Sequence, residues 1–163
     1  MIKSIFLNYK SRQATKPKEH GTYEKAQSIG VLYNADEFDL NIINNLIDDI
    51  SKDQKSVTSL GFTSAKPDPN NPDELIFSKK DISATGTFKR DNVAKFIQQD
   101  FDFLISLDTS ANINYKFVLT SSKANCKVGF EAEEYENLLL MTMNLSGNKS
   151  ESVQHLLTYL KKV

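Results

Sequence analysis

The sequence predicts a three-layer α/β fold, in which helices cover both faces of a mostly parallel sheet of about five strands. Short apolar runs alternate along the chain with segments whose apolar residues recur at helical spacing. Several runs are apolar throughout, which is typical of strands covered on both faces in a parallel sheet. The chain has 163 residues and 39% hydrophobic content, so a single domain can bury a sufficient core.

The N-terminal region is expected to be a short amphipathic helix followed by a linker. Apolar residues in its first dozen positions recur at helical spacing: Met1, Ile2, Ile5, Phe6 and Tyr9. This stripe would pack either on the domain or on a partner. Residues 12–21 lack periodicity and contain Pro17, which favours a linker. Residues 1–27 are therefore interpreted as a basic helix and linker, and residues 28–163 as a single α/β domain.

The first part of the domain is predicted to be a strand, a helix and a second strand. A β-rich run at residues 29–33 ends at Asn34, and helical spacing of apolar residues follows at 38–50. Strand character returns at residues 57–62. Two parallel strands joined by a helix form a βαβ unit, and its crossover is expected to be right-handed.

The rest of the domain continues this alternation. Three prolines within residues 64–73 exclude a helix or a central strand there, so this stretch is expected to be an exposed loop. The elements expected after it are a short edge strand at 75–77, helices at 92–99, 111–121 and 151–161, and strands at 101–107, 126–130 and 138–145. The last of these strands is apolar enough to be covered on both faces. The alternation is that of a Rossmann-like or flavodoxin-like sheet.

The charge is divided unevenly along the chain. The first 28 residues hold six basic and two acidic residues, a net charge of +4, whereas the remainder holds 14 basic and 19 acidic residues, a net charge of −5. The basic residues of the arm include Lys3, Lys10, Arg12, Lys16 and Lys18. Three interpretations stay open: contact with an anionic surface such as nucleic acid or lipid, packing against the acidic body, and simple solvation.

The sequence favours a cytoplasmic protein. A lone Cys126 forms no internal disulfide, and the chain does not open with the charged, apolar and small-residue pattern of a secretory leader. No stretch approaches the roughly 20 apolar residues of a spanning helix. We therefore expect no transmembrane segment.

Two polar clusters stand where strands are expected to end. Asn34, Asp36 and Glu37 follow the first strand; Asp108, Thr109, Ser110 and Asn112 follow the central strand. Ligands of open α/β sheets bind outside the carboxyl ends of the strands where the strand order reverses, and an order of 2-1-3 makes the two clusters neighbours. Carboxylates from both clusters suit a divalent cation. An alternative needs no ligand: Asp108, Thr109 and Ser110 are ordinary caps for the helix that follows, and acidic residues are common in turns.

Other chemistry is not indicated by the residues. His20 falls in the linker and His155 lies off the apolar stripe of the last helix, so neither makes a convincing base. Cys126 opens a buried strand, where cysteine is usually inert. No glycine-rich phosphate loop follows the first strand, and no Cys or His pair has zinc-ligand spacing. We expect no catalytic residue, no bound metal and no cofactor.

Four segments of the chain carry a further signal: SIGVLYNADEFD, VTSLGFTS, IFSKKDISATGTFKRDNVAKFIQQDFDFLISLD and SKANCKVGF. Together they resemble an uncharacterised family of small α/β proteins from Bacteroidetes. The resemblance spans most of the chain and implies a cytoplasmic domain of unknown function, with no catalytic residue to carry over.

Two further resemblances are local. FDFLISLDTSANINYKFVLTSSKANCKVGF is similar to a strand-helix-strand piece of the acceptor-side, N-terminal domain of heptosyltransferase-type glycosyltransferases, which are two-domain enzymes. An Asp after the central strand, acids after the first strand and Lys149 after the last strand resemble the receiver domain of response regulators. In that family the last strand ends in Lys and the strand before it in Ser or Thr, whereas Asn144 and Gly129 or Phe130 occupy those positions here.

The preferred functional hypothesis is a non-catalytic cytoplasmic module that binds an unidentified protein partner. It is motivated by the missing catalytic constellations, the basic amphipathic arm and the acidic body. The alternative is a small enzyme, or a sensor of an ion or small molecule, with its site at the carboxyl ends of the first and central strands. Such a site would be a glycosyltransferase-like or receiver-like remnant.

Overall fold

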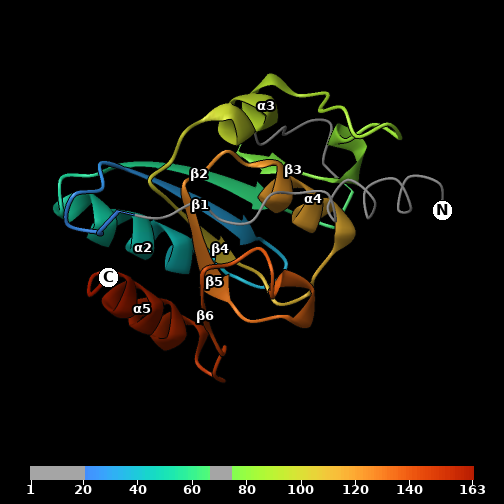
Figure 1. The fold of residues 1–163 in the computed structure, drawn as a ribbon. Coiled ribbons are helices and arrows are strands. Elements are labelled where there is room, and N and C mark those ends of the chain that lie inside the picture. Colours follow the sequence, from blue (N-terminus) through green and yellow to red (C-terminus); the bar gives the residue numbers. More distant parts are fainter. Residues whose placement is uncertain (1–20, 67–74) are drawn as a thin grey trace.

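The computed structural model describes residues 21–66 and 75–163, which form one parallel sheet with helices on both faces (Figure 1). The predicted α/β fold is confirmed. The predicted N-terminal helix and most of the proline-rich loop lie outside the described residues. Within the described residues the sheet has six strands, since the short segment expected at the edge pairs with its neighbour through two residues.

The helices and strands follow one another in the predicted order. The strands are β1 (Ser28–Asn34), β2 (Ser56–Phe62), β3 (Ile76–Phe77), β4 (Phe103–Leu107), β5 (Cys126–Phe130) and β6 (Met141–Met143). The α-helices are α2 (Leu40–Lys52), α3 (Asp91–Gln98), α4 (Ile113–Ser121) and α5 (Lys149–Leu160), and the 3-10 helices are η1 (Lys79–Asp81) and η2 (Glu133–Tyr135).

The strand order is β3-β2-β1-β4-β5-β6, and every neighbouring pair is parallel. From β1 the chain builds outward through β2 to β3, then crosses back to β4 and builds outward on the other side. The order therefore reverses between β1 and β4. This is the Rossmann order, one of the two arrangements that the sequence predicted.

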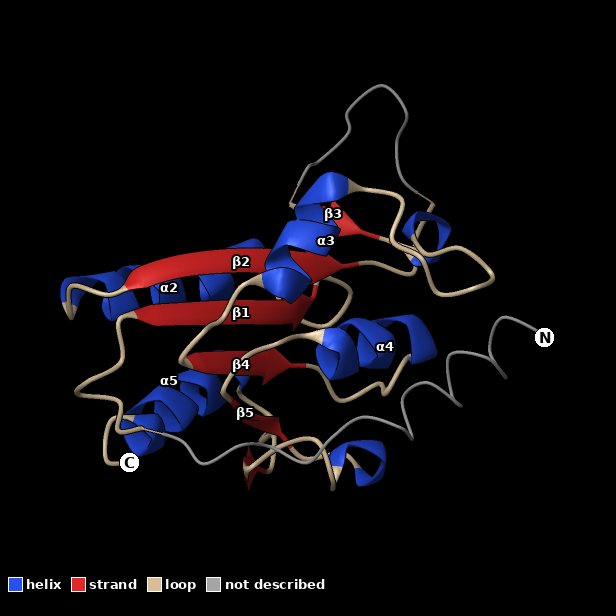
Figure 2. Ribbon diagram, turned by 45° about the horizontal axis from the view of Figure 1, so that its top comes forward, coloured by secondary structure: helices blue, strands red, loops and turns tan. Residues whose placement is uncertain are grey.

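Two apolar layers hold the helices to the sheet. On one face α2 and α5 pack together against β1, β4 and β5, and their buried side chains include Ile43, Leu46 and Leu156. On the other face α3 and α4 cover the sheet, with Phe96 and Tyr115 among the buried side chains. Figure 2 shows α2 and α5 behind the strands and α3 and α4 in front of them. Cores on both faces explain why β1 and β4 are apolar in nearly every position.

Gly129 in β5 allows the close approach of the neighbouring strand. A Cβ atom at this position would lie 2.2 Å from the backbone oxygen of Ser106 in β4. No side chain fits at that distance without a shift of the backbone. The sequence requires glycine here for packing, not for an unusual backbone angle.

The last strand differs from its prediction. The apolar run at 138–145 was expected to be buried on both faces, but only residues 141–143 form β6, and Thr142 is exposed. Leu138 and Leu139 belong to the turn after η2, whose amides hydrogen-bond back to Tyr135. Among the described strands, β6 pairs with β5 alone, so it lies at the edge of the sheet. Hydrophobicity predicts burial of a strand, but it does not distinguish a central strand from an edge strand.

Among the helices in the described part of the chain, none is both long enough and apolar enough to cross a membrane.

Candidate functional site

The two predicted polar clusters lie side by side at the carboxyl edge of the sheet. Asn34 is the last residue of β1, and Asp108 directly follows β4, the strand paired with β1. The side-chain amide of Asn34 donates to Asp108 Oδ1 over 2.7 Å. The expected juxtaposition is confirmed, and it falls at the reversal of strand order.

Asp108 is the centre of this cluster. Its side chain is fully buried, and its two oxygens accept four hydrogen bonds. Oδ1 accepts from Asn34 Nδ2 and from Ser110 Oγ, each at 2.7 Å. Oδ2 accepts from the Ala111 amide at 2.9 Å and from the hydroxyl of Tyr135. A buried carboxylate with four donors is held as a structural acceptor, and it joins the ends of β1 and β4 to η2.

Two buried tyrosines, which the sequence reasoning missed, complete the network. Tyr115 of α4 donates its hydroxyl proton to the carbonyl of Leu32 over 2.8 Å and accepts from Ser106 Oγ at 2.9 Å. Burial, followed by the charge of Asp108, raises the pKa of Tyr115. Burial also raises the pKa of Tyr135. Both phenols therefore remain protonated donors. A tyrosine placed after a predicted strand is a weak signal, because tyrosine also serves as ordinary core.

Glu37 reaches the Asp108 loop from the side of β1. Its Oε2 accepts from the amide and from the hydroxyl of Thr109, both at 3.0 Å. Partial burial and then the charge of Asp108 raise the pKa of Glu37, against the hydrogen bonds of Thr109 and the charge of Lys149. Lys149, at the start of α5, also donates to the Glu37 carbonyl. The net pKa of Glu37 therefore lies above its ordinary value.

Asp36 does not join the Asp108 cluster. Its carboxylate turns toward the end of β2, where Oδ1 accepts from Thr63 Oγ1 at 2.7 Å and Oδ2 accepts from the Ser64 amide at 2.8 Å. Burial raises the pKa of Asp36, but the hydrogen bonds of Ser64 and Thr63 outweigh it and the net pKa lies below the ordinary value. Asp36 therefore fastens the β1–α2 loop to the β2 end.

The N-cap of α4 is none of the three residues, Asp108, Thr109 and Ser110, for which capping was predicted. Asn112 is the N-cap of α4 and accepts from the Asn114 amide at 2.9 Å. Asp108 and Ser110 lie in the loop before the helix, where their side chains accept hydrogen bonds from the amides of Ala111 and Asn112. Ala111 between them and the helix has a φ of 53°, a left-handed value that non-glycine residues seldom adopt. The helix therefore begins only after this residue.

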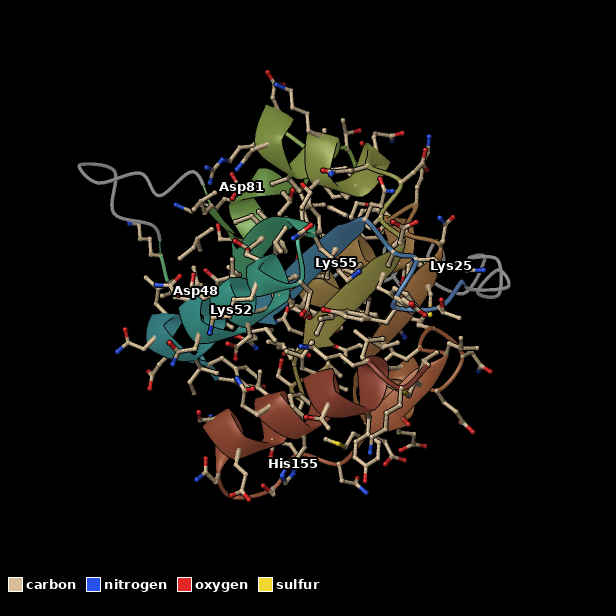
Figure 3. All side chains as sticks on the ribbon, turned by 90° about the vertical axis from the view of Figure 1, so that its left-hand side faces the viewer. Lys25, Asp48, Lys52, Lys55, Asp81 and His155 are labelled. Atoms are coloured by element: carbon tan, nitrogen blue, oxygen red, sulfur yellow. The ribbon has the colours of Figure 1, made fainter. Side chains whose placement is uncertain are left out.

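The described residues include no group of three or more His, Cys, Asp or Glu side chains that could hold a metal ion. The Asp108 oxygens already accept four hydrogen bonds, so a cation there would have to displace protein donors. His155 of α5 (Figure 3) lines a groove beside β6, and its Nε2 atom lies 3.8 Å from Glu151 Oε1. Burial raises the pKa of the Cys126 thiol to about 11, so it stays protonated. His20 lies outside the described residues.

The open edge at β6 offers concave surface that the sequence reasoning missed. We use the name β6 surface for Leu140, β6 itself, the Glu131–Glu136 segment and Tyr159 of α5. A groove of about 520 Å³ separates β6 from α5, and Met141, Met143 and Leu156 contribute its apolar walls. A second groove, of about 680 Å³, lies beside η2 on the other side of β6. Leu140 and Tyr159 are 47% and 57% exposed.

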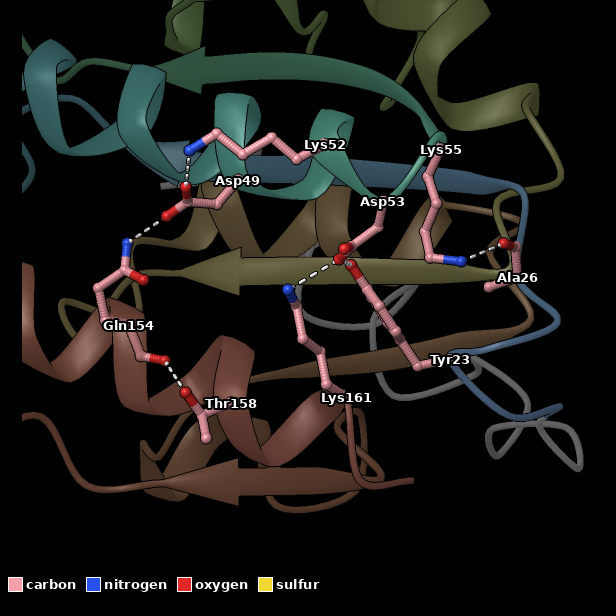
Figure 4. Close-up of polar contacts among 9 residues, drawn as sticks. All are labelled: Tyr23, Ala26, Asp49, Lys52, Asp53, Lys55, Gln154, Thr158 and Lys161. Carbon is pink, nitrogen blue, oxygen red and sulfur yellow. Dashed lines mark hydrogen bonds and ion pairs between the residues drawn. The ribbon is translucent and has the colours of Figure 1, made fainter.

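At the amino edge of the sheet, a group of polar side chains from separate elements contact one another (Figure 4). The Tyr23 hydroxyl donates to Asp53 Oδ2 at 2.9 Å, and Lys161 Nζ lies 2.8 Å from the same oxygen. Lys55 lies over the Tyr23 ring, 4.6 Å from its centroid. The Tyr23 amide donates to the carbonyl of Val163. These contacts tie the entry to β1, the end of α2 and the end of α5 together.

Comparison with known proteins agrees with the resemblance found in the sequence. No curated protein matches the chain. Residues 2–163 match the model of a family of unknown function, DUF6913, which fits the resemblance to an uncharacterised family; the match shows neither a Bacteroidetes origin nor a similarity to glycosyltransferases. Because the match covers nearly the whole chain, this protein belongs to the DUF6913 family.

Proposed function

We propose that this protein is a non-catalytic module that binds a protein partner through its β6 surface. The observation that carries the proposal is a contrast between two regions: the carboxylates at the carboxyl edge are hydrogen-bonded within the chain, whereas Leu140 and Tyr159 of the β6 surface are exposed. At the carboxyl edge the carboxylates of Asp36, Glu37 and Asp108 all accept hydrogen bonds from neighbouring loops. Catalytic acids, bases and nucleophiles need access to a substrate. Carboxylates that accept hydrogen bonds from the chain itself suit a scaffold better than a reaction centre.

The β6 surface has the features of a recognition site. An edge strand carries backbone groups on its outer side that can pair with another chain. Grooves run along both of its faces, so alternate side chains of an added strand would enter one groove or the other. Exposed Tyr159 and Leu140 border these grooves, and aromatic residues are common anchors of interfaces. An extended peptide segment of the partner is therefore the ligand that this geometry suits best.

Affinity capture with paired variants tests the proposal. Tagged protein would be compared with Leu140→Lys and Tyr159→Lys variants in a lysate of the cells that naturally make it, with mass-spectrometric identification of bound proteins. The proposal requires a protein that binds wild type and is lost with both variants. Leu40→Lys is the matched control, because Leu40 is 61% exposed on α2, away from β6. Capture that is absent, or equal for all four proteins, would rule the proposal out.

A second candidate function is supported by Glu37. It is a partly buried carboxyl with a raised pKa at the reversal of strand order, where open α/β sheets hold their ligands. A small enzyme or a sensor of an ion or small molecule would use this edge. Calorimetric titration with Mg²⁺, nucleotides and sugar nucleotides is the test. Heat that disappears in Glu37→Gln and in Asp108→Asn would support it, and no heat with any ligand would eliminate it.

The proposed setting is the cytoplasm. Cys126 has a buried thiol with a raised pKa, which suits a protein without structural disulfides. Contact of Lys3, Lys10, Arg12, Lys16 and Lys18 with an anionic surface stays a competing use of the N-terminal arm. Sedimentation with vesicles containing 30% anionic lipid would reveal that use directly.

A further inference from the structure

We propose that residues 1–20 of the chain bind in the groove beside η2 of the same molecule. The occupant is thus the basic N-terminal segment itself. This inference deepens the proposed function, because it identifies the chain's own segment as a ligand of one groove of the β6 surface. Docking of the segment requires no partner, so it can be tested alone.

The groove beside η2 combines apolar walls with negative charge. Its lining residues are Glu131, Ala132, Glu133, Glu136, Leu139, Leu140 and Thr142. Glu134 adds a fourth carboxylate within six residues of sequence. All four glutamates are exposed, and none forms an ion pair with a described basic side chain. Leu140 is half exposed between them. This surface suits a ligand that is both apolar and basic.

The N-terminal segment has that composition. Its basic residues are Lys3, Lys10, Arg12, Lys16 and Lys18, against the single acidic residue Glu19. Its apolar residues are concentrated within the first nine positions: Met1, Ile2, Ile5, Phe6, Leu7 and Tyr9. Exposed apolar side chains in water favour burial against another surface. Charge complementarity then selects the acidic groove among the surfaces available.

The tether is long enough to reach. Gly21 lies at the amino edge of the sheet, beside Asp102 and Asn125. β5 starts directly after Asn125 and ends where the Glu131–Glu136 segment begins, so its five residues span about 16 Å. One further strand spacing of about 4.8 Å leads to β6. At about 3.3 Å per residue, some six or seven residues cover that distance. The first dozen residues, with their apolar and basic side chains, remain for the groove.

Covalent attachment favours the chain's own segment over that of a second copy. A short flexible tether holds a ligand at an effective concentration on the order of millimolar. Protein at micromolar concentration offers a competing copy of the segment about a thousandfold more dilute. Intramolecular docking should therefore dominate in dilute solution.

Paramagnetic relaxation in full-length protein provides the main test. A nitroxide is attached at Asn8→Cys, since the native Cys126 is buried and stays protonated. Methyl signals of Leu139, Leu140 and Met143 should broaden strongly, whereas those of Leu75, next to the opposite edge strand β3, should not. Uniform broadening, or no broadening at β6, would overturn the proposal.

A charge reversal sharpens the test. Glu133→Lys combined with Glu136→Lys should abolish the broadening, because two attractive contacts become repulsive. Asp48→Lys combined with Asp100→Lys is the matched control, since both residues are exposed and lie away from η2. Equal broadening in the two double variants would contradict docking through charge.

Mixed samples separate intramolecular docking from docking between copies. Isotope-labelled wild type is mixed with unlabelled, spin-labelled protein at 50 μM each. Intramolecular docking predicts narrow methyl signals in the mixture, whereas broadening there would assign the segment to a second copy and overturn the inference. If the segment docks and no partner is captured, the proposed function fails while this inference stands. If a partner is captured through the β6 surface but the methyl signals stay sharp, the proposed function stands and this inference fails.

Discussion

The carboxyl edge between β1 and β4 and the β6 surface differ in how far their polar groups are satisfied from within the chain. At the first, Asp108 is fully buried and accepts from four donors, and loops from three strands meet on it. At the second, an edge strand has grooves on both sides, and Leu140 and Tyr159 face solvent. Polarity alone therefore does not mark a binding site. In this molecule the polar groups that are bonded within the chain are buried at the carboxyl edge, whereas the grooves beside β6 lie open to solvent.

Removal of the central acceptor should have the largest effect. Asp108→Ala would leave the buried Asn34 amide and the Tyr135 hydroxyl without their acceptor, together with Ser110 and the Ala111 amide. We expect a loss of about 3 to 5 kcal/mol in the free energy of unfolding, measured by urea denaturation. Asp48→Ala, at an exposed position of α2, is the control and should change it by less than about 0.5 kcal/mol. Similar values for both variants would show that the carboxyl edge is not structural.

A methyl group at Gly129 should have the next largest effect. Gly129→Ala places a Cβ atom against the Ser106 carbonyl, so β4 and β5 must separate or shift. Overpacking of this kind costs about 1 to 3 kcal/mol of unfolding free energy. Gly147→Ala has open space around its new Cβ atom and serves as the matched control in the same denaturation series. An unchanged midpoint for Gly129→Ala would mean that the sheet tolerates a wider strand spacing here.

Substitution at the β6 surface should affect binding and leave stability nearly unchanged. Leu140→Lys should alter the unfolding free energy by less than about 0.5 kcal/mol, because Leu140 is half exposed. Partner capture should nevertheless be lost, whereas Asp108→Asn, if it remains folded, should retain it. Circular dichroism and affinity capture on the same preparations would separate the two effects. A large stability loss in Leu140→Lys would erase the contrast between the two regions.

The smallest effect concerns pH and Glu37. The pKa of Glu37 is raised in the folded state, so its contribution to stability is complete below the ordinary carboxyl pKa of about 4.3 and declines as pH rises through the folded value. Glu37→Gln removes this titration. Relative to wild type, the variant should therefore become more stable as pH increases from 4 to 7, as measured by denaturation at each pH. A difference independent of pH would show that burial and Asp108 do not influence this carboxyl.

Much of the architecture was readable from local patterns. Helical spacing in α2 and continuous apolarity in β1 and β4 predicted the element types and the two-sided burial. The expected neighbourhood of Asn34 and Asp108 followed from one topological rule, that carboxyl ends of parallel strands share an edge. The edge position of β6 was missed because apolar content does not reveal how many neighbours a strand has.

The details of the polar cluster were less predictable. Asp36 and Glu37 are adjacent in sequence, yet Asp36 bonds to the β2 end and Glu37 to Thr109. Successive side chains in a loop point in different directions, so a cluster in sequence need not be a cluster in space. Tyr135 lies 27 residues from Asp108, and only the fold brings its hydroxyl to that carboxylate.

The sequence by itself indicated where most helices and strands lie, that the sheet is mostly parallel, and that the arm is basic while the body is acidic. These properties depend on residue spacing, hydrophobicity and charge, which act over short stretches of chain. Only the tertiary structure decided that Asp108 is enclosed and that β6 is open. Enclosure depends on how many segments meet at a point, and contacts between residues far apart in sequence determine that number.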